Sequence, residues 1–255
     1  MKDIVNILWT GGLDSTYRVL ELSQKDVTIQ PYYLAYVNPS TQYEINAIKQ
    51  ITEELLKRPE TKCTLRPLII VQTSKIEPNA EITAAWEKLH ELYRLGSQYD
   101  WIARFAEQND LTLELGIEKD DKESTILRCL SNCGGYSFLN DEEVMVSDKG
   151  TEEAKLVFKN MRFPLPLFNM TKVDEIAKFK EWGADSILNR TWFCYRPVDG
   201  KPCGLCDPCK TYIEVGLADR IPKNRLALYY FRKRHPHLFN SIRNLKHRIK
   251  RLMVK

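Results

Sequence analysis

Short apolar segments of strand type alternate with longer segments of helix type along most of the chain. Segments rich in β-branched and aromatic residues predict strands at residues 4–9, 28–37, 63–71 and 111–117. Apolar residues at helical spacing predict helices at residues 15–22, 42–56, 82–93, 100–108 and 173–182. Elements that alternate at this interval form βαβ units, in which helices cover both faces of a parallel sheet. The sequence therefore predicts a Rossmann-like α/β fold.

Charge is divided unevenly between the body of the chain and its C-terminal end. Residues 220–255 hold 12 of the 38 Lys and Arg residues and none of the 34 Asp and Glu residues, so residues 1–219 carry a net charge of −8. Helical spacing predicts helices at 225–234 and 240–252 within this basic tail, whereas the polar stretch 119–150 is irregular. We expect three parts, which are an α/β domain at 1–185, a metal-binding subdomain at 186–218 and a basic helical extension at 219–255.

A glycine-rich turn joins the first predicted strand to the first predicted helix, and its sequence is Trp9-Thr10-Gly11-Gly12-Leu13-Asp14-Ser15-Thr16. Glycines let the backbone approach a ligand, and a helix N-terminus offers unpaired N–H groups to phosphate. The turn has neither the lysine of the ATPase loop nor the spacing of the dinucleotide-binding loop. A carboxylate such as Asp14 is compatible with phosphate where Mg²⁺ bridges the two. The alternative is an ordinary strand–turn–helix in which Asp14 caps the helix.

Four cysteines gather within 16 residues ahead of the basic tail, and they are Cys194, Cys203, Cys206 and Cys209. Thiolates at this spacing suit tetrahedral Zn²⁺, and four of them fill its coordination sphere as in structural sites. An iron–sulfur cluster is the competing interpretation, because ferredoxin-like sites also use C-x2-C-x2-C spacing. The chain has seven cysteines, and an odd number argues against a disulfide framework.

The composition favours a cytoplasmic protein that does not enter the membrane. No apolar run approaches the roughly 20 residues that span a bilayer, and Thr10 interrupts the first one too early for a signal peptide. Basic residues of the tail are interleaved with aromatic ones, a pattern that binds nucleic acid or an acidic protein surface through residues 220–255. The alternative is a tail that docks its apolar stripe on the acidic body. The oligomeric state stays open, with a homodimer among the alternatives.

The glycine-rich turn closely resembles the SGGxDS pyrophosphate-binding loop of the PP-loop ATP pyrophosphatases, with a threonine in place of the first serine. Enzymes of this kind share an adenine nucleotide α-hydrolase-like fold. They cleave ATP between its α- and β-phosphates and adenylate a substrate oxygen. The resemblance implies that ATP and Mg²⁺ bind here. The residues that it assigns to the nucleotide are Thr10, Gly11, Gly12, Leu13, Asp14, Ser15 and Thr16 in the loop, with Tyr36 and Val37 near the adenine.

Two further motifs narrow the resemblance to the 7-cyano-7-deazaguanine synthase family. They are Thr191-Trp192-Phe193-Cys194-Tyr195 and Cys203-Gly204-Leu205-Cys206-Asp207-Pro208-Cys209. Members convert 7-carboxy-7-deazaguanine, ATP and ammonia to a nitrile, by adenylating first the carboxylate and then the amide. The resemblance covers about residues 3–217 and implies a ligase of the queuosine biosynthesis type with structural zinc on the four cysteines. It also implies catalytic roles for Asp14, Ser15 and Lys172; the alternative for Lys172 is a solvated side chain on a first helical turn.

The half of the family's site that holds the deazaguanine and the amine is changed in this chain. The family's G-R-N stretch is Gly96-Ser97-Gln98 here, and no Y-P-D-C-R run follows the fourth predicted strand. Asp121 stands where the family has an aspartate. We expect Gln98 and Asp121 to contact the substrate, while the identities of the acid and of the amine stay open.

These observations support one leading function and three alternatives. The leading hypothesis is an ATP-dependent ligase that adenylates a deazaguanine-like carboxylate, releases pyrophosphate and transfers the acyl group to ammonia or another amine. One alternative is a homologue that attaches a deazaguanine to a protein, as relatives in antiviral gene clusters do. Another is a PP-loop enzyme that modifies tRNA and grips it with the basic tail. The third is a nucleotide-binding interaction module without activity, against which the retained Asp14 and Ser15 argue.

Overall fold

The computed structural model describes residues 3–118, 125–139, 142–165 and 167–238. The chain falls into two compact units, which are Met1–Trp192 and Phe193–Lys255. The division of the second unit at residue 218 stays a prediction. Within the described ranges, no helix is both long enough and apolar enough to cross a membrane.

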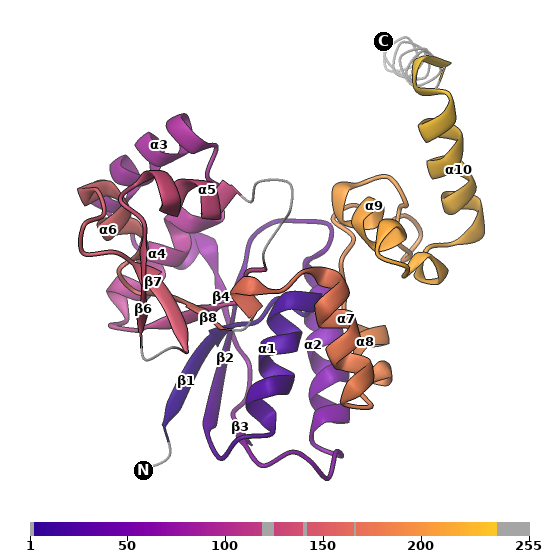
Figure 1. The fold of residues 1–255 in the computed structure, drawn as a ribbon, viewed down its shortest axis with the longest axis horizontal. Helices are drawn as coiled ribbons and strands as arrows, with labels where there is room; N and C mark the ends of the chain where they lie inside the picture. The colour runs from indigo at the N-terminus through magenta and orange to yellow at the C-terminus, as the bar shows by residue number, and fades with distance from the viewer. Residues whose placement is uncertain (1–2, 119–124, 140–141, 166, 239–255) are drawn as a thin grey trace. The chain divides into compact units, whose positions relative to one another are not determined.

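The first unit is built on a sheet to which the described residues contribute eight strands, in the order β3-β2-β1-β5-β8-β7-β6, with β4 also beside β2 (Figure 1). The strands are β1 (Ile4–Leu8), β2 (Thr28–Ala35), β3 (Thr64–Leu65), β4 (Ile69–Gln72), β5 (Leu113–Leu115), β6 (Tyr136–Leu139), β7 (Glu143–Val146) and β8 (Met161–Pro164). Strands β1 to β5 and β8 pair in parallel. All eight residues of β2 are buried, as expected of a parallel strand covered on both faces.

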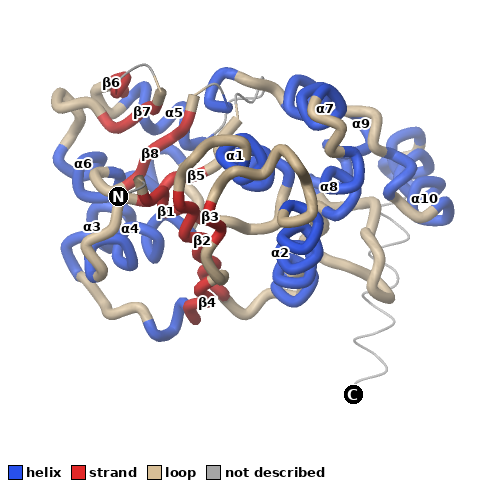
Figure 2. The backbone as a smooth tube through the Cα atoms, turned by 90° about the horizontal axis from the view of Figure 1, so that it is seen from below, coloured by secondary structure: helices blue, strands red, loops and turns tan. Residues whose placement is uncertain are grey.

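Helices cover both faces of this sheet, which Figure 2 shows nearly edge-on. One face carries α1 (Leu13–Ser23), α2 (Thr41–Leu55), α7 (Lys172–Glu181) and α8 (Asp185–Arg190). The other face carries α3 (Ala80–Tyr93), α4 (Gln98–Gln108) and α6 (Glu152–Phe158), and α5 (Thr125–Asn132) packs on α3. The Rossmann-like α/β fold predicted from the sequence is therefore confirmed.

The strand order places a topological switch point between β1 and β5. From β1 the chain runs through α1 to β2 on one side, whereas β5 pairs with the other side of β1. In open α/β sheets, ligands bind at such a point beyond the carboxyl ends of the strands. Two segments meet there: the turn at residues 9–12 that leads into α1, and residues 116–118 that follow β5.

Two of the sequence-based predictions about this sheet are wrong. The single strand expected at residues 63–71 is two short strands, because Pro67 has no N–H to donate to the ladder and the side-chain amide of Gln30 bonds to its carbonyl instead, at 3.2 Å. The stretch 119–150, expected to be irregular, contains α5, β6 and β7 among its described residues. Strands β6 and β7 run antiparallel beside β8, so the sheet is parallel only in part.

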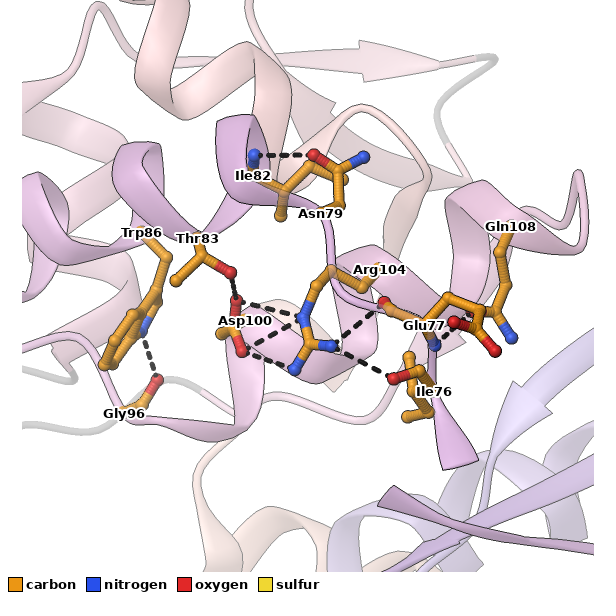
Figure 3. Close-up of polar contacts among 10 residues, drawn as sticks. All are labelled: Ile76, Glu77, Asn79, Ile82, Thr83, Trp86, Gly96, Asp100, Arg104 and Gln108. Atoms are coloured by element: carbon orange, nitrogen blue, oxygen red, sulfur yellow. Dashed lines mark hydrogen bonds and ion pairs between the residues drawn. The ribbon is translucent and has the colours of Figure 1, made fainter. Parts of the chain in front are cut away.

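A polar network joins the start of α4 to α3 (Figure 3). The carboxylate of Asp100 accepts a hydrogen bond from the Thr83 hydroxyl at 2.8 Å and an ion-paired one from Arg104 Nη2 at 2.7 Å. Trp86 Nε1 donates to the carbonyl of Gly96 just before α4, at 3.0 Å. Charge-assisted bonds of this kind fix both distance and orientation. They hold the first turn of α4, which carries Gln98 and Trp101.

The second unit contains α9 (Asp207–Glu214) and α10 (Lys223–Arg234) in its described residues. The rings of Phe193 and Tyr212 stack with centroids 3.7 Å apart, and the Arg220 guanidinium lies 5.1 Å from the Phe193 centroid. The helix predicted at 225–234 is therefore present, and its Tyr229 is buried. The helix predicted at 240–252 lies outside the described residues.

A buried ion pair connects α1 to the sheet. Arg18 donates to both oxygens of Glu114 in β5, from Nε at 2.7 Å and from Nη2 at 2.8 Å. Glu143 at the start of β7 lies beside this pair. Burial, together with the negative charge of Glu114, raises the pKa of Glu143 from 4.5 to about 6.

Glu143→Gln tests this electrostatic arrangement. The folded protein binds the Glu143 proton more tightly than the unfolded chain does, so stability falls as pH rises from about 4.5 to about 6. Glutamine does not ionise, so the free energy of unfolding of the variant does not fall in this way. We expect the variant to be more stable than the parent protein by about 1 kcal/mol at pH 8, half the full linkage value because the side chain is only half-buried. The difference should vanish near pH 4.5.

Urea unfolding at pH 4.5 and at pH 8 measures both free energies. Glu142→Gln, which changes the exposed neighbouring side chain, is the matched control and should follow the parent protein at both pH values. A Glu143→Gln variant that is less stable than the parent at pH 8 would contradict this account of the cluster.

Candidate functional site

The glycine-rich turn is held in shape by its own hydroxyl groups and by α2. Thr10 Oγ1 and Ser15 Oγ lie 3.1 Å apart, and the backbone N–H of Thr10 also donates to Ser15 Oγ at 3.2 Å. Gly11 has φ +69°, and a Cβ there would lie 2.9 Å from the carbonyl oxygen of Glu44 in α2. Glycine is therefore required at position 11 both by conformation and by space.

The first turn of α1 begins directly after this loop. Gly12 is its N-cap and offers no side-chain cap, so no capping side chain occupies the N–H groups of this turn. Asp14 is partly exposed, whereas Leu13 and Thr16 are buried. The Thr16 hydroxyl accepts a hydrogen bond from Trp9 Nε1 at 3.0 Å, so this side chain is turned inward. The loop thus presents backbone N–H groups and the Asp14 carboxylate at the end of β1.

Lys172 lies against Asp14, although 158 residues separate them in the sequence. Its Nζ is 2.6 Å from Asp14 Oδ1 and 2.5 Å from Glu118 Oε1. Burial alone would lower the pKa of Lys172, but the charges of Asp14, Glu175 and Glu118 outweigh it and raise the pKa. The ammonium therefore stays charged at the start of α7.

A capping box fixes the end of α7 that carries this lysine. The Thr171 hydroxyl accepts from the backbone N–H of Asp174 at 3.3 Å, and the Asp174 carboxylate accepts from the N–H of Thr171 at 2.9 Å. Further along, the ring of Tyr17 in α1 stacks on Trp182 with centroids 5.3 Å apart. These contacts hold α7 on α1 and so hold Lys172 beside the loop.

Two acidic residues that the sequence interpretation missed complete this cluster. Glu118 and Glu175 each place a carboxylate oxygen within 4.8 Å of one another and of Asp14. Glu175 is fully buried, and neither of its oxygens has a hydrogen-bond partner among the described residues. Burial, with the nearby charge of Asp14, raises the pKa of Glu175 well above its usual range.

The sequence contains only weak indications that these two residues belong to the site. Glu118 follows the predicted strand at 111–117, and the carboxyl ends of neighbouring parallel strands share one edge. Glu175 lies three residues after Lys172, which puts both on one helix face. The structural reason for Glu118 is the close contact at Gly116, where a Cβ would lie 2.8 Å from the backbone nitrogen of Ser15.

The aromatic motif at Thr191-Trp192 also reaches the loop. The backbone N–H of Trp192 donates to the carbonyl of Gly11 at 2.8 Å. The Trp192 indole stacks on the ring of Tyr43 in α2, with centroids 4.7 Å apart and planes at 17°. Trp192 therefore links the glycine-rich turn to α2, through its backbone on one side and its ring on the other.

The remaining predicted ligand-contacting residues differ in their placement. Tyr36 and Val37 follow β2 and are exposed, and the Tyr36 ring lies 5.5 Å from that of Trp101 in α4. Gln98 is exposed at the start of α4 and folds its amide back over Gly96. Asp121 lies outside the described residues. The structure thus puts Tyr36 and Val37 at the carboxyl end of β2, and their contact with adenine stays a prediction.

The four cysteines of the second unit converge as the spacing predicted. Their sulfur atoms all lie within 4.8 Å of one another, with Cys203 to Cys209 and Cys194 to Cys206 each at 3.9 Å. Tetrahedral Zn²⁺ with 2.3 Å bonds sets sulfur atoms about 3.8 Å apart. The backbone N–H groups of Cys203 and Cys206 donate to neighbouring sulfurs at 3.2 and 3.3 Å, as suits thiolate acceptors. The cluster is compatible with zinc.

The matches to known proteins cover most of this chain, including the glycine-rich turn and the four cysteines. The model of a family described as queuosine biosynthesis protein QueC matches residues 4–215. A 7-cyano-7-deazaguanine synthase of Nautilia profundicola is 23% identical over 239 residues, which cover 87% of this chain and 98% of that protein. The synthase of Campylobacter curvus is 24% identical over 238 residues, covering 89% and 100%. A 59-residue segment is 44% identical to the synthase of Rhizorhabdus wittichii, covering 21% and 25%.

The fold and the comparisons together define an enzyme of the PP-loop ATP pyrophosphatase kind. The chain belongs to the QueC family, whose model matches most of its length. Its low identity to relatives of nearly equal length makes it a diverged member. The family resemblance drawn from the sequence is thereby confirmed.

Proposed function

We propose that the protein is a ligase that uses ATP to adenylate a carboxylate and then transfers the acyl group to an amine. The observation that carries this proposal is the contact between Lys172 and Asp14 beside the uncapped first turn of α1. Backbone N–H groups, one ammonium and one carboxylate at a helix N-terminus suit a polyphosphate accompanied by a divalent cation. The relatives are named 7-cyano-7-deazaguanine synthases, and the family resemblance implies 7-carboxy-7-deazaguanine as the acid from which that nitrile is made.

The chemistry requires a better leaving group on the carboxylate. A carboxylate oxygen forms a bond to the α-phosphorus of ATP while the bond to the bridging oxygen breaks, and pyrophosphate leaves. The amine then attacks the acyl carbon, and AMP leaves with the former carboxylate oxygen. With ammonia the product is an amide, and a second adenylation of the amide oxygen with loss of two protons and AMP gives a nitrile.

Each group of residues in the site has its own part in this chemistry. The loop from Thr10 to Ser15 binds the departing pyrophosphate through its N–H and hydroxyl groups, and Leu13 and Thr16 support it from the buried side. Lys172 stabilises negative charge that develops on the transferred phosphoryl group. Tyr36 and Val37 contact the adenine. The oxygen donors around Asp14 fit Mg²⁺, which would supply neutralisation of the phosphate charge.

Pyrophosphate release tests this function directly. The purified protein is incubated with ATP, Mg²⁺ and 7-carboxy-7-deazaguanine, with and without ammonium, and products are identified by mass spectrometry. We expect pyrophosphate and AMP only when the acid is present, and the nitrile only with ammonium. Asp14→Asn and Lys172→Met should each lower kcat at least about 100-fold, because the first removes an oxygen donor that fits Mg²⁺ and the second removes a positive charge beside the transferring phosphate.

Lys178→Met is the matched control for these variants. Lys178 lies on the same helix and pairs with Glu181 at 2.8 Å on the surface, so this change should leave turnover intact. AMP formation with the acid but no amide or nitrile would assign a different amine, such as one on a protein. The absence of any acid-dependent pyrophosphate would contradict the proposed function.

We also propose that the four cysteines hold one structural Zn²⁺. Their number fills the coordination sphere, so no position is left for a substrate. Gly204, with φ +73°, forms the turn between the second and third ligands, and a Cβ there would lie 3.0 Å from the carbonyl oxygen of Arg225 in α10. The metal would therefore stabilise the contact between this turn and α10 within the second unit.

Cys203→Ser tests the zinc site. After dialysis against a chelator, we expect one equivalent of zinc in the parent protein and almost none in the variant, because three thiolates bind zinc far more weakly than four. Limited proteolysis should then cut the variant faster within the second unit. Cys63→Ser, in the first unit, is the control and should retain its zinc. Iron together with visible absorption in the parent protein would instead indicate an iron–sulfur cluster.

A further inference from the structure

The carboxylates around Lys172 come from three separate segments of the first unit. Asp14 lies in the first turn of α1, Glu118 three residues beyond β5, and Glu175 in the first half of α7. One oxygen of each lies within 4.8 Å of the other two. Octahedral Mg²⁺ with oxygens at about 2.1 Å sets neighbouring ligands about 3.0 Å apart and opposite ligands about 4.2 Å apart. The three oxygens therefore lie near enough to one another for small movements to bring them onto one divalent cation.

Glu175 is the observation that separates this cluster from an ordinary acidic patch. Its carboxyl group is fully buried, and neither oxygen has a hydrogen-bond partner among the described residues. Burial of a carboxyl group without a hydrogen-bond partner destabilises the folded protein, and the neighbouring charge of Asp14 adds to this cost. Since the group is aimed at Asp14 and Glu118, a cation bound between the three would satisfy it.

Lys172 occupies the place of such a cation only in part. Its ammonium pairs with Asp14 at 2.6 Å and with Glu118 at 2.5 Å, and no hydrogen bond joins it to Glu175. One positive charge thus faces three acidic groups. A divalent cation balances the negative charge of the three carboxylates better than one ammonium does, and it can bind an oxygen of each. It competes with the ammonium for the same oxygens of Asp14 and Glu118.

We propose that Asp14, Glu118 and Glu175 form a divalent-cation site in which Lys172 holds the place of the metal. Cation binding releases Lys172 from Asp14 and leaves its ammonium free for phosphate oxygens. This inference rests on the proposed function for its purpose, since Mg²⁺ accompanies ATP, but the site itself needs no nucleotide. Glu118 and Glu175 act as metal ligands, and Lys172 opposes the metal until phosphate is present.

Mn²⁺ binding in the absence of ATP tests the site. The full chain with its cysteine cluster loaded with zinc is titrated with Mn²⁺, and the free ion is measured by electron paramagnetic resonance. We expect Lys172→Met to bind one Mn²⁺ at least about tenfold more tightly than the parent protein, because the competing charge is gone. Glu175→Gln in the Lys172→Met background should weaken binding at least about tenfold, as loss of a ligand does.

The controls lie on the same helix. Lys178→Met and Glu181→Gln change a surface ion pair on α7 and should leave Mn²⁺ affinity as in the parent protein. Should Glu175→Gln fail to fold, as judged by its thermal unfolding, Glu118→Gln in the Lys172→Met background serves the same purpose and should also weaken binding. Equal affinities for the parent protein and Lys172→Met, or for Lys172→Met with and without a carboxylate change, would overturn the proposal.

The pyrophosphate assay and the Mn²⁺ titration test the proposed function and the cation site separately, so that failure of one can be told from failure of the other. Mn²⁺ binding with the expected pattern in a protein that releases no pyrophosphate would keep the metal site and remove the proposed substrate. Acid-dependent pyrophosphate release, together with a Mn²⁺ affinity that substitutions at Lys172 and Glu175 leave unchanged, would support the function and overturn the metal site.

Discussion

The contact between Lys172 and Asp14 is the interaction around which the candidate site of the first unit is arranged. These two side chains belong to the first turns of two helices that are 158 residues apart. An ion pair at 2.6 Å requires both turns to be fixed, since a long lysine side chain gains little from a mobile partner. The capping box of α7, the stacking of Tyr17 on Trp182 and the packed glycine-rich turn supply that rigidity.

The switch point of the sheet explains why the acidic groups meet there. β1 leads into the loop that ends in Asp14, and β5 leads into Glu118, so neighbouring strands deliver two carboxylates to one edge. α7 then adds Lys172 and Glu175 from the same face of the sheet as α1. Charges of both signs at the end of a parallel sheet are costly for stability and useful for phosphate chemistry. The fold and the site are thus parts of one arrangement.

The sequence predicted the local features of this arrangement and missed those that depend on packing. The glycine-rich turn and the four cysteines each lie within about 20 residues, so spacing alone indicated their chemistry. Glu118 and Glu175 carry no such pattern, and only the contact at Gly116 and the seat of α7 on α1 bring them to Asp14. The hairpin of β6 and β7 was missed because its short strands are half exposed at an edge of the sheet. Its polar neighbours resemble a loop.

The central claim is that a carboxylate is activated through AMP, and isotope transfer tests it most directly. With the acid labelled with ¹⁸O in its carboxylate, ATP unlabelled and an amine present, AMP is isolated and its mass measured. The account predicts one ¹⁸O atom in AMP, because the carboxylate oxygen that attacks the α-phosphorus leaves with it. AMP without label, formed alongside pyrophosphate, would mean that water attacks ATP, and it would contradict the account.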